Sequence, residues 1–499
     1  GPLFLDELKA RLHEARAQGG SKAKLQALLA RLRRLNLLDP ACGCGNFLVI
    51  AYREIRRLEL EAVEALQAID RRNRDVSYTL DAKQFEYIQC DVHQFHGIEI
   101  EPSAAHIATV ALWLTDHQEN LRASRVLGGN FNRLPLVRRA NIVCANALTV
   151  DWGSVLLPEL CDYVVGNPPF VGKKEQNAEQ KTVFGPVMSG LHGSGVLDFV
   201  AAWYVKAARY LADAAARMGQ TPGAHKPAAP KSRPASAPYA PQRQPAVSVR
   251  TRCAFVSTNS ITQGEQVGVL WGWMLAQGMK IQFAHRTFQW SNDAKGVAAV
   301  HCVIIGFGTD DVPGKVIFDY PDLKGEPVAL AARNINPYLV DAADVVLQRR
   351  TNPVCAVPSL VEGITPLDNG ILAFTPDEAN AFLAKEPTAA KWMRPWLTGN
   401  YFINGTLSYC LWLADSTPME LRKMPQVMAL IADVKAFRLS SKSSQKFADR
   451  PWLFRETSIP DRFILIPKTS SERREYFPLG FVERVVPTNS ALYLADADV

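Results

Sequence analysis

Short apolar runs that end in polar residues alternate with helical patterns over the first two thirds of the chain. The runs expected as strands are Asn36–Asp39, His96–Ile100, Ile142–Ala145, Tyr163–Gly166, Ala254–Ser257, Ile281–His285 and Val300–Gly306. The helical patterns between them are Asn46–Ile69, Ser103–Asn120, Leu197–Ala216 and Gly264–Gln277. Strands that alternate with helices form a mostly parallel sheet. We therefore predict an α/β fold with helices on both faces of the sheet.

The pattern divides the chain into three parts. Residues 1–35 are expected as a helical lead-in, because leucines recur there at helical spacing on either side of Gly19-Gly20. Residues 36–325 carry the alternating pattern, interrupted at about 213–252 by a basic insertion rich in proline and alanine that we expect to be disordered. Residues 326–499 are expected as a mixed α+β domain, incomplete at its C-terminus.

The net charge of +7 is unevenly distributed along the 499 residues. Residues 214–252 hold seven basic side chains and no acidic one, and Arg422–Arg474 holds twelve basic and five acidic ones. The second tract mixes cations with hydroxyl groups around Ser440–Lys446, a composition that suits contacts with phosphate oxygens. A solvated surface is the alternative for any single residue of the tract.

The sequence gives no indication of a membrane or metal protein. It contains no apolar run of membrane-spanning length and no visible signal peptide. The nine cysteines form no Cys-x-x-Cys pair, which predicts reduced thiols in the cytoplasm. Cys42 and Cys44 have no second pair nearby, so we assign no metal site.

Four of the expected strands end in groups that suit a nucleotide-like ligand. Asp39 opens a turn with Gly43 and Gly45 that leads into a helix, where backbone can approach a ligand closely. Glu99 can accept ribose hydroxyls, and Asn146 can meet an adenine edge. The fourth strand runs into Asn-Pro-Pro-Phe at 167–170, where amide and carbonyl oxygens can accept from one amino group. Each turn alone fits an ordinary strand end; the four in this order favour a ligand site.

These strings resemble the gamma-arrangement, adenine-specific DNA methyltransferases that use S-adenosylmethionine (SAM). The resemblance is greatest to the methyltransferase and target-recognition regions of type IIL restriction–modification enzymes and related phage-defence methylases. It is carried by residues 38–54, 97–102, 166–174, 195–204, 255–261 and 288–295. It implies a Rossmann-like class I methyltransferase domain at 36–325, a target-recognition domain at 326–499, and transfer of a methyl group to the N6 amino group of a flipped adenine.

The resemblance also implies roles for individual residues. Those implied to bind SAM are Asp39, Ala41, Gly43, Gly45, Phe47, Glu99, Ile100, Asn146 and Ala147. Those implied to act in catalysis are Asn167, Pro168, Pro169 and Phe170, with Phe170 stacking on the flipped base and Trp290 or Phe288 as a second aromatic wall. For contact with double-stranded DNA we single out Lys442, Lys446, Arg450, Arg473 and Arg474.

The chain departs from the family pattern upstream. The family's other cofactor motif and the N-terminal nuclease of type IIL enzymes have no counterpart here, so we expect no DNA cleavage by this chain. A segment that carries them, or other subunits of a defence system, are the further partners this implies. Two alternatives stay open: a DNA-recognition module without turnover, and a methyltransferase that acts on RNA adenine or protein glutamine.

Overall fold

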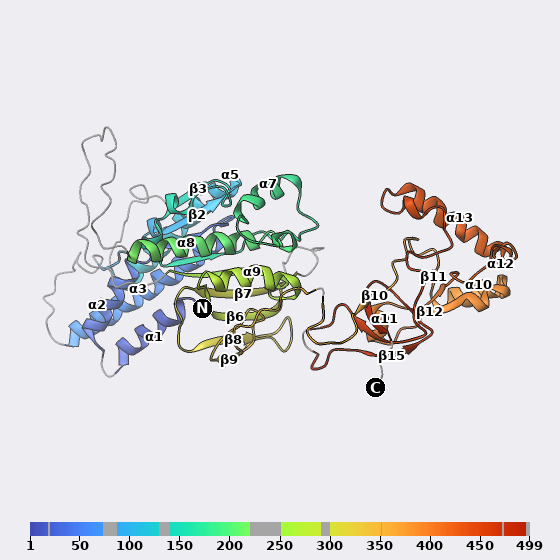
Figure 1. The fold of residues 1–499 in the computed structure, drawn as a ribbon. Coiled ribbons are helices and arrows are strands. Elements are labelled where there is room, and N and C mark those ends of the chain that lie inside the picture. The colour runs from blue at the N-terminus through green and yellow to red at the C-terminus, as the bar shows by residue number, and fades with distance from the viewer. Residues whose placement is uncertain are drawn as a thin grey trace. The chain divides into compact units, whose positions relative to one another are not determined.

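The computed structural model divides the chain into two compact units, Gly1–Arg349 and Arg350–Val499 (Figure 1). The structure describes residues 1–17, 20–72, 87–128, 140–219, 251–290, 300–350, 352–471 and 474–495. Most of the proline- and alanine-rich insertion therefore lies outside the described residues.

A nine-stranded sheet forms the centre of the first unit, with the strand order β3-β2-β1-β4-β5-β7-β6-β8-β9. Strands β1 to β5 all run parallel to one another, whereas β7 runs antiparallel to both β5 and β6. The strands are β1 (Leu37–Asp39), β2 (Phe95–Glu99), β3 (Asn141–Cys144), β4 (Tyr163–Gly166), β5 (Arg252–Thr258), β6 (Lys280–Trp290), β7 (Val300–Gly308), β8 (Lys315–Asp319) and β9 (Val328–Ala332).

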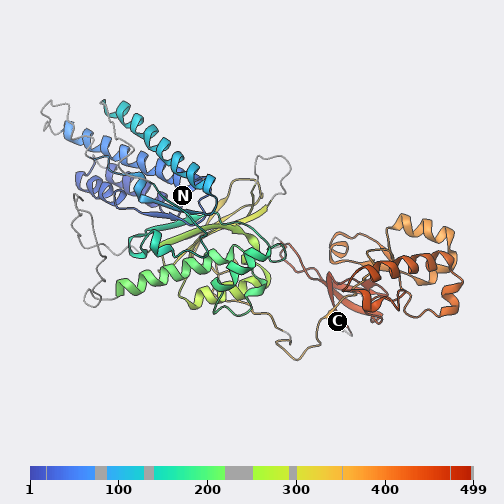
Figure 2. The ribbon, with the colours of Figure 1, turned by 90° about the horizontal axis from the view of Figure 1, so that it is seen from above.

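Helices cover both faces of this sheet, as Figure 2 shows by colour. One apolar cluster joins the sheet to α1 (Leu5–Arg16), α2 (Lys22–Leu32), α3 (Asn46–Arg72) and α5 (Pro102–Leu127). The other joins it to α6 (Trp152–Val155), α7 (Ala178–Val187), α8 (Ala201–Gly219) and α9 (Gly264–Ala276). The predicted α/β fold is confirmed. No helix in the described part of the chain is long and apolar enough to cross a membrane.

The sheet continues beyond the strands that the sequence pattern identified. β8 and β9 add an edge to it, and β9 lies past residue 325, where we expected the first domain to end. β9 is an apolar run, Val-Ala-Leu-Ala-Ala, that is exposed along most of its length and that the sequence pattern did not identify as a strand. The functional boundary between the two domains stays a prediction.

The second unit holds two small four-stranded sheets. One has the order β10-β17-β14-β15 and the other β11-β13-β12-β16. The strands are β10 (Val361–Glu362), β11 (Ala373–Phe374), β12 (Met393–Leu397), β13 (Tyr409–Leu411), β14 (Arg462–Pro467), β15 (Gly480–Glu483), β16 (Val486–Pro487) and β17 (Ala491–Ala495). The helices are α10 (Pro376–Lys385), α11 (Gly399–Asn404), α12 (Pro418–Arg422) and α13 (Pro425–Ser440).

A buried arginine at the end of α13 organises the loop that follows this helix. The Arg438 guanidinium donates hydrogen bonds of 2.7–3.3 Å to five backbone carbonyls, those of Pro366, Leu367, Phe447, Arg450 and Leu453. Arg438 is only 1% exposed, and burial lowers its pKa. The Arg438 guanidinium therefore binds backbone carbonyls, although the basic composition of residues Arg422–Arg474 suggested contact with phosphate.

We expect Arg438→Met to destabilise the second unit by about 3 kcal/mol, because five carbonyls lose a buried donor. Chemical denaturation followed by tryptophan fluorescence measures this change. Lys435→Met, at an exposed position on the same helix, is the matched control and should change the free energy of unfolding by less than about 0.5 kcal/mol. Equal midpoints for the two variants would contradict the structural role of Arg438.

Candidate active site

The order of the strands brings the four polar motifs to one edge of the first sheet. β3, β2, β1 and β4 are neighbours and all run parallel, so their carboxyl ends lie side by side. The chain order reverses between β1 and β4, the position at which open α/β sheets bind their ligands. Asp39 and Glu99 end their strands, and the turns with Asn146 and Asn167 follow β3 and β4.

The turn after β1 depends on glycine. Gly43 and Gly45 have φ values of 53° and 85°, a region that side chains rarely adopt. A Cβ atom at Gly45 would also lie 3.0 Å from the Cβ of Ala108 on α5, whereas one at Gly43 would meet nothing within 4 Å. Gly45 thus packs α3 against α5, and Gly43 leaves open backbone before the N-terminus of α3.

Two carboxylates converge on this turn. Asp39 is fully buried; its Oδ1 accepts from Ala41 N at 3.0 Å, and its Oδ2 has no partner within the described residues. Glu99 accepts from Gly43 N at 2.8 Å through Oε2 and from Glu101 N at 2.9 Å through Oε1. Burial, with a smaller contribution from Glu99, raises the pKa of Asp39 to about 7. The turn therefore combines two carboxylates with the partly exposed backbone at Gly43.

Two apolar side chains stand exposed beside the acids. Phe47, in the first turn of α3, is 38% exposed, and Ile100, after β2, is 56% exposed. Large apolar groups at the rim of an acidic turn suit a ligand that combines a ring with a positive charge. The predicted cofactor residues Asp39, Ala41, Gly43, Gly45, Phe47, Glu99 and Ile100 all belong to this strand-end region.

The turn after β3 is ordered around Asn146. Its Oδ1 accepts from Leu148 N at 2.9 Å, and its backbone carbonyl accepts from Thr149 N and Val150 N at 3.0 Å each. The carboxamide oxygen is therefore occupied, and the NH₂ group is the part of the side chain left to donate to a ligand. Ala147 is buried, and its carbonyl accepts a hydrogen bond from the Trp152 indole at 2.9 Å.

The Asn-Pro-Pro-Phe turn presents free acceptors. Asn167 is exposed, and neither its carboxamide nor the carbonyl of buried Pro168 is bonded to another described residue. Phe170 is partly buried and packs on the apolar cluster under the sheet edge. A Cβ at Gly166 would lie 3.0 Å from Asp39 Oδ1, so β4 passes close to the acidic turn. The motifs predicted for catalysis and for the cofactor are thus immediate neighbours.

Two residues that sequence reasoning left without a role hold these turns in place. Asp198 accepts from Lys173 N at 3.1 Å through Oδ1 and from the Ser260 hydroxyl through Oδ2. Trp203 donates its indole N–H to the carbonyl of Pro40 at 3.1 Å. Both lie in the 195–204 string that carried the resemblance, which is the signal by which they could have been found.

The candidate second aromatic wall lies further along the same edge. β6 runs parallel to β4, so Phe288 and Trp290 near its end belong to the same sheet edge as Asn167. Two strands separate β6 from β4, which corresponds to roughly 14 Å. Phe288 stacks on Tyr320 with ring centroids 5.1 Å apart. Of Trp290 the structure gives only the backbone, so both residues stay predictions for this role.

In the second unit, the cations singled out for DNA are solvent-exposed where the structure describes them. Lys442, Lys446 and Arg450 lie in the loop that Arg438 anchors, and Lys446 Nζ lies 5.2 Å from the centroid of the Phe447 ring. Arg474 is exposed before β15, and Arg473 lies outside the described residues. Exposure fits a nucleic-acid surface, and contact with DNA stays a prediction.

No metal centre accompanies the site in the part of the chain that the structure describes. No group of three or more histidine, cysteine or acidic side chains is arranged there to hold an ion. Burial, followed by the charges of Asp39 and Glu99, raises the pKa of the Cys42 thiol. Cys42 is therefore a neutral packing residue beside the turn.

Two family models match the chain. The model described as MmeI, DNA-methyltransferase domain, matches residues 15–221 and 238–319, and that described as MmeI, target recognition domain, matches residues 341–499. The chain is 33% identical over 511 residues to "DNA methyltransferase A" of Bacillus subtilis (strain 168), covering 100% of this chain and 51% of the relative.

A solved structure agrees with these matches. It is that of the type IIL restriction–modification enzyme MmeI in complex with DNA, which superposes with a TM-score of 0.81 at 44% identity, over 100% of this chain and 61% of that one. The chain thus spans between half and two thirds of the length of these relatives. With the predicted motifs gathered at one sheet edge, the chain belongs to the MmeI family, as its DNA-methyltransferase domain followed by its target recognition domain.

Proposed function

We propose that this protein transfers a methyl group from SAM to the N6 amino group of a flipped adenine in a specific DNA sequence, as the modification activity of a restriction–modification or phage-defence system. The observation that carries the proposal is the side-by-side placement of an acidic, glycine-rich turn and an exposed Asn-Pro-Pro-Phe turn. The first suits the cofactor and the second suits the acceptor base.

The residues of the acidic turn fit SAM, which is cationic. Asp39 Oδ2 is buried without a partner among described residues, so a nearby positive charge would stabilise its carboxylate. Glu99 would accept the ribose hydroxyls with its remaining lone pairs, and Ile100 and Phe47 would pack on the ligand's apolar parts. Asn146 would donate from its NH₂ group to an acceptor on the adenine edge.

The exposed acceptors of the second turn fit an adenine amino group. The lone pair of this nitrogen is delocalised into the ring, which makes it a poor nucleophile. Hydrogen bonds from its two hydrogens to the Asn167 carboxamide oxygen and the Pro168 carbonyl would favour a pyramidal nitrogen whose lone pair is available. SAM supplies the electrophilic methyl group, and the amino group loses one proton to water. Positioning then supplies most of the catalysis.

Base flipping is required because the amino group is out of reach within a duplex. Stacking on Phe170, which is held against the core while part of its ring stays exposed, would offset the unstacking cost of a few kcal/mol. Exposed Lys442, Lys446 and Arg450 in the second unit support a nucleic-acid substrate in preference to protein glutamine. The likeness to MmeI, whose solved structure is a complex with DNA, supports DNA in preference to RNA. Labelled SAM offered with duplex DNA, RNA or protein distinguishes the three acceptors.

We expect Asn167→Ala to lower methyl transfer by at least about a thousandfold, because the amino group loses a positioned acceptor. SAM binding, measured by calorimetry, should be unchanged because Asn167 lies outside the acidic turn. The transfer assay uses duplex DNA and labelled SAM. Turnover at the natural rate would refute the role of the turn.

We expect SAM affinity to increase as the pH rises from 6 to 8. Asp39, whose pKa is about 7, is largely protonated at the lower pH and ionised at the higher one, where its carboxylate attracts the cation. Calorimetric titrations of the natural chain and of Asp39→Asn across this range measure the effect. Protonation of SAM itself affects the titrations of the natural chain and of Asp39→Asn equally. Identical pH profiles of the two proteins would therefore show that Asp39 does not interact with SAM.

We expect Lys446→Ala to weaken binding to all duplex sequences alike and to reduce the slope of log K against log salt by about 1. Fluorescence anisotropy with two unrelated duplexes at several salt concentrations measures both quantities. Lys385→Ala, an exposed cation at the end of α10, is the matched control and should leave the slope unchanged. A loss confined to one sequence would instead mark Lys446 as a base-reading residue.

A further inference from the structure

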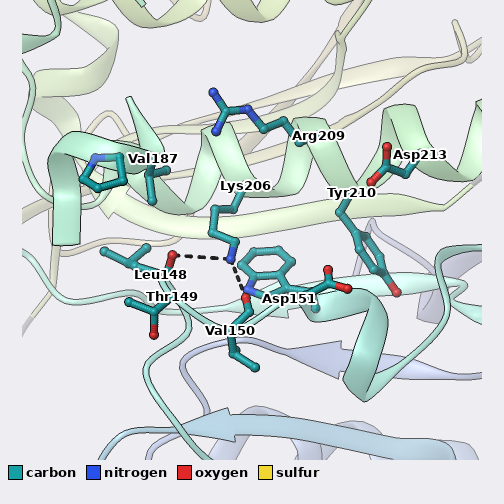
Figure 3. A pocket seen from close by; sticks show the side chains of 11 residues that line it. Leu148, Thr149, Val150, Asp151, Val187, Lys206, Arg209, Tyr210 and Asp213 are labelled. Atoms are coloured by element: carbon teal, nitrogen blue, oxygen red, sulfur yellow. Dashed lines mark hydrogen bonds between the residues drawn. The ribbon is translucent and has the colours of Figure 1, made fainter. Parts of the chain in front are cut away.

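A pocket of about 370 Å³ lies between the β3–α6 turn and helices α7 and α8 (Figure 3). Lys206 and Arg209 of α8 extend into it together with Tyr210 and Asp213, and the turn contributes residues from Leu148 to Trp152. Leu148, the first residue of the turn that lines the pocket, lies two positions after Asn146 in the sequence. One of its walls is therefore the back of the turn that we assign to the cofactor's adenine.

The carbonyls of this turn are satisfied from the pocket side. Lys206 Nζ donates to Val150 O at 2.5 Å and to Leu148 O at 3.5 Å, as Figure 3 shows. The Trp152 indole N–H donates to the carbonyl of Ala147, and the centroid of the Trp152 ring lies 5.7 Å from Lys206 Nζ. The ammonium and the indole together bind three of the four carbonyls from residue 147 to residue 150, and the exception is that of Thr149.

Three amides of the same turn donate to Asn146. Its side chain accepts from Leu148 N, and its carbonyl accepts from Thr149 N and Val150 N. The Leu148 N–H shares its peptide with the Ala147 carbonyl, and the Thr149 N–H shares its peptide with the Leu148 carbonyl. The orientation of Asn146 therefore depends on where these two peptides lie. Trp152 binds the carbonyl of the first of these peptides and Lys206 that of the second. Lys206 does so from α8, where its neighbours Tyr204, Val205 and Ala207 are fully buried.

We propose that Lys206 is a positioning residue for cofactor binding: its ammonium group holds the Asn146–Val150 turn from behind, so that the Asn146 carboxamide faces the adenine edge of SAM. This inference rests on the proposed function. The role requires a donor that reaches two carbonyls, which lysine and arginine can provide and methionine cannot.

The surroundings of Lys206 make its hydrogen bonds to the turn sensitive to pH. Burial lowers the pKa of Lys206 to about 8; Asp151 opposes the shift and Arg209 adds to it. Asp213 and Tyr210 are the other titratable groups that line the pocket. As the pH rises through about 8 the ammonium becomes an amine, a weaker donor, so the turn should loosen and SAM affinity should fall above this pH.

The first test measures the turn without SAM. Hydrogen exchange of the Leu148, Thr149 and Val150 amides should accelerate in Lys206→Met and stay close to natural in Lys206→Arg. Arg209→Met is the matched control, because Arg209 lines the same pocket but donates to Ser189 O at 2.8 Å, away from the turn. Unchanged exchange in Lys206→Met would overturn the proposal.

The second test is calorimetric titration with SAM. Lys206→Met should raise the dissociation constant about tenfold, Arg209→Met should leave it unchanged, and Lys206→Arg should keep its affinity between pH 7 and 9.5 better than the natural chain does. Faster exchange with unchanged SAM affinity would overturn the link to the cofactor. If the natural chain bound no SAM, the proposed function would fail, while the exchange experiment would still decide whether Lys206 holds the turn.

Discussion

Parallel pairing of β1 with β2 on one side and with β4 on the other is the constraint on which the rest of the site depends. Because the chain order reverses between β1 and β4, the helices that follow these strands pack on opposite faces and leave the strand ends accessible. An acidic turn and an exposed carboxamide turn are thereby brought together, although Asp39 and Asn167 are far apart in the sequence. Gly166 allows the close passage, since a side chain there would crowd Asp39.

Each turn is supported from behind by the helical layer. Trp203 holds Pro40, Lys206 holds Leu148 and Val150, and Asp198 holds the segment after the Asn-Pro-Pro-Phe turn. All three supports come from α8 or the residues just before it. One helix and the residues just before it thus support the acidic turn, the turn after β3 and the segment after the Asn-Pro-Pro-Phe turn, while the acceptors of Asn167 and Pro168 stay free among the described residues.

The strands that position the site could be predicted closely because each is a short apolar run that ends in a polar motif. The predicted Tyr163–Gly166 coincides with β4, and the three strands before it differ from prediction by at most one residue at each end. The supports could not be predicted, because contacts such as that of Asp198 with Ser260 join residues distant in sequence. Composition misled us at Arg438: charge counting cannot distinguish a phosphate contact from a cation buried among carbonyls.

The most direct test of the central claim is nucleoside mass spectrometry, with long-read sequencing, of DNA from cells that express the protein. We expect N6-methyladenine in one defined sequence context in cells that express the natural protein. We expect none in cells that express Asn167→Ala. Unmodified adenine throughout, in cells where the natural protein is folded and SAM is abundant, would contradict the claim.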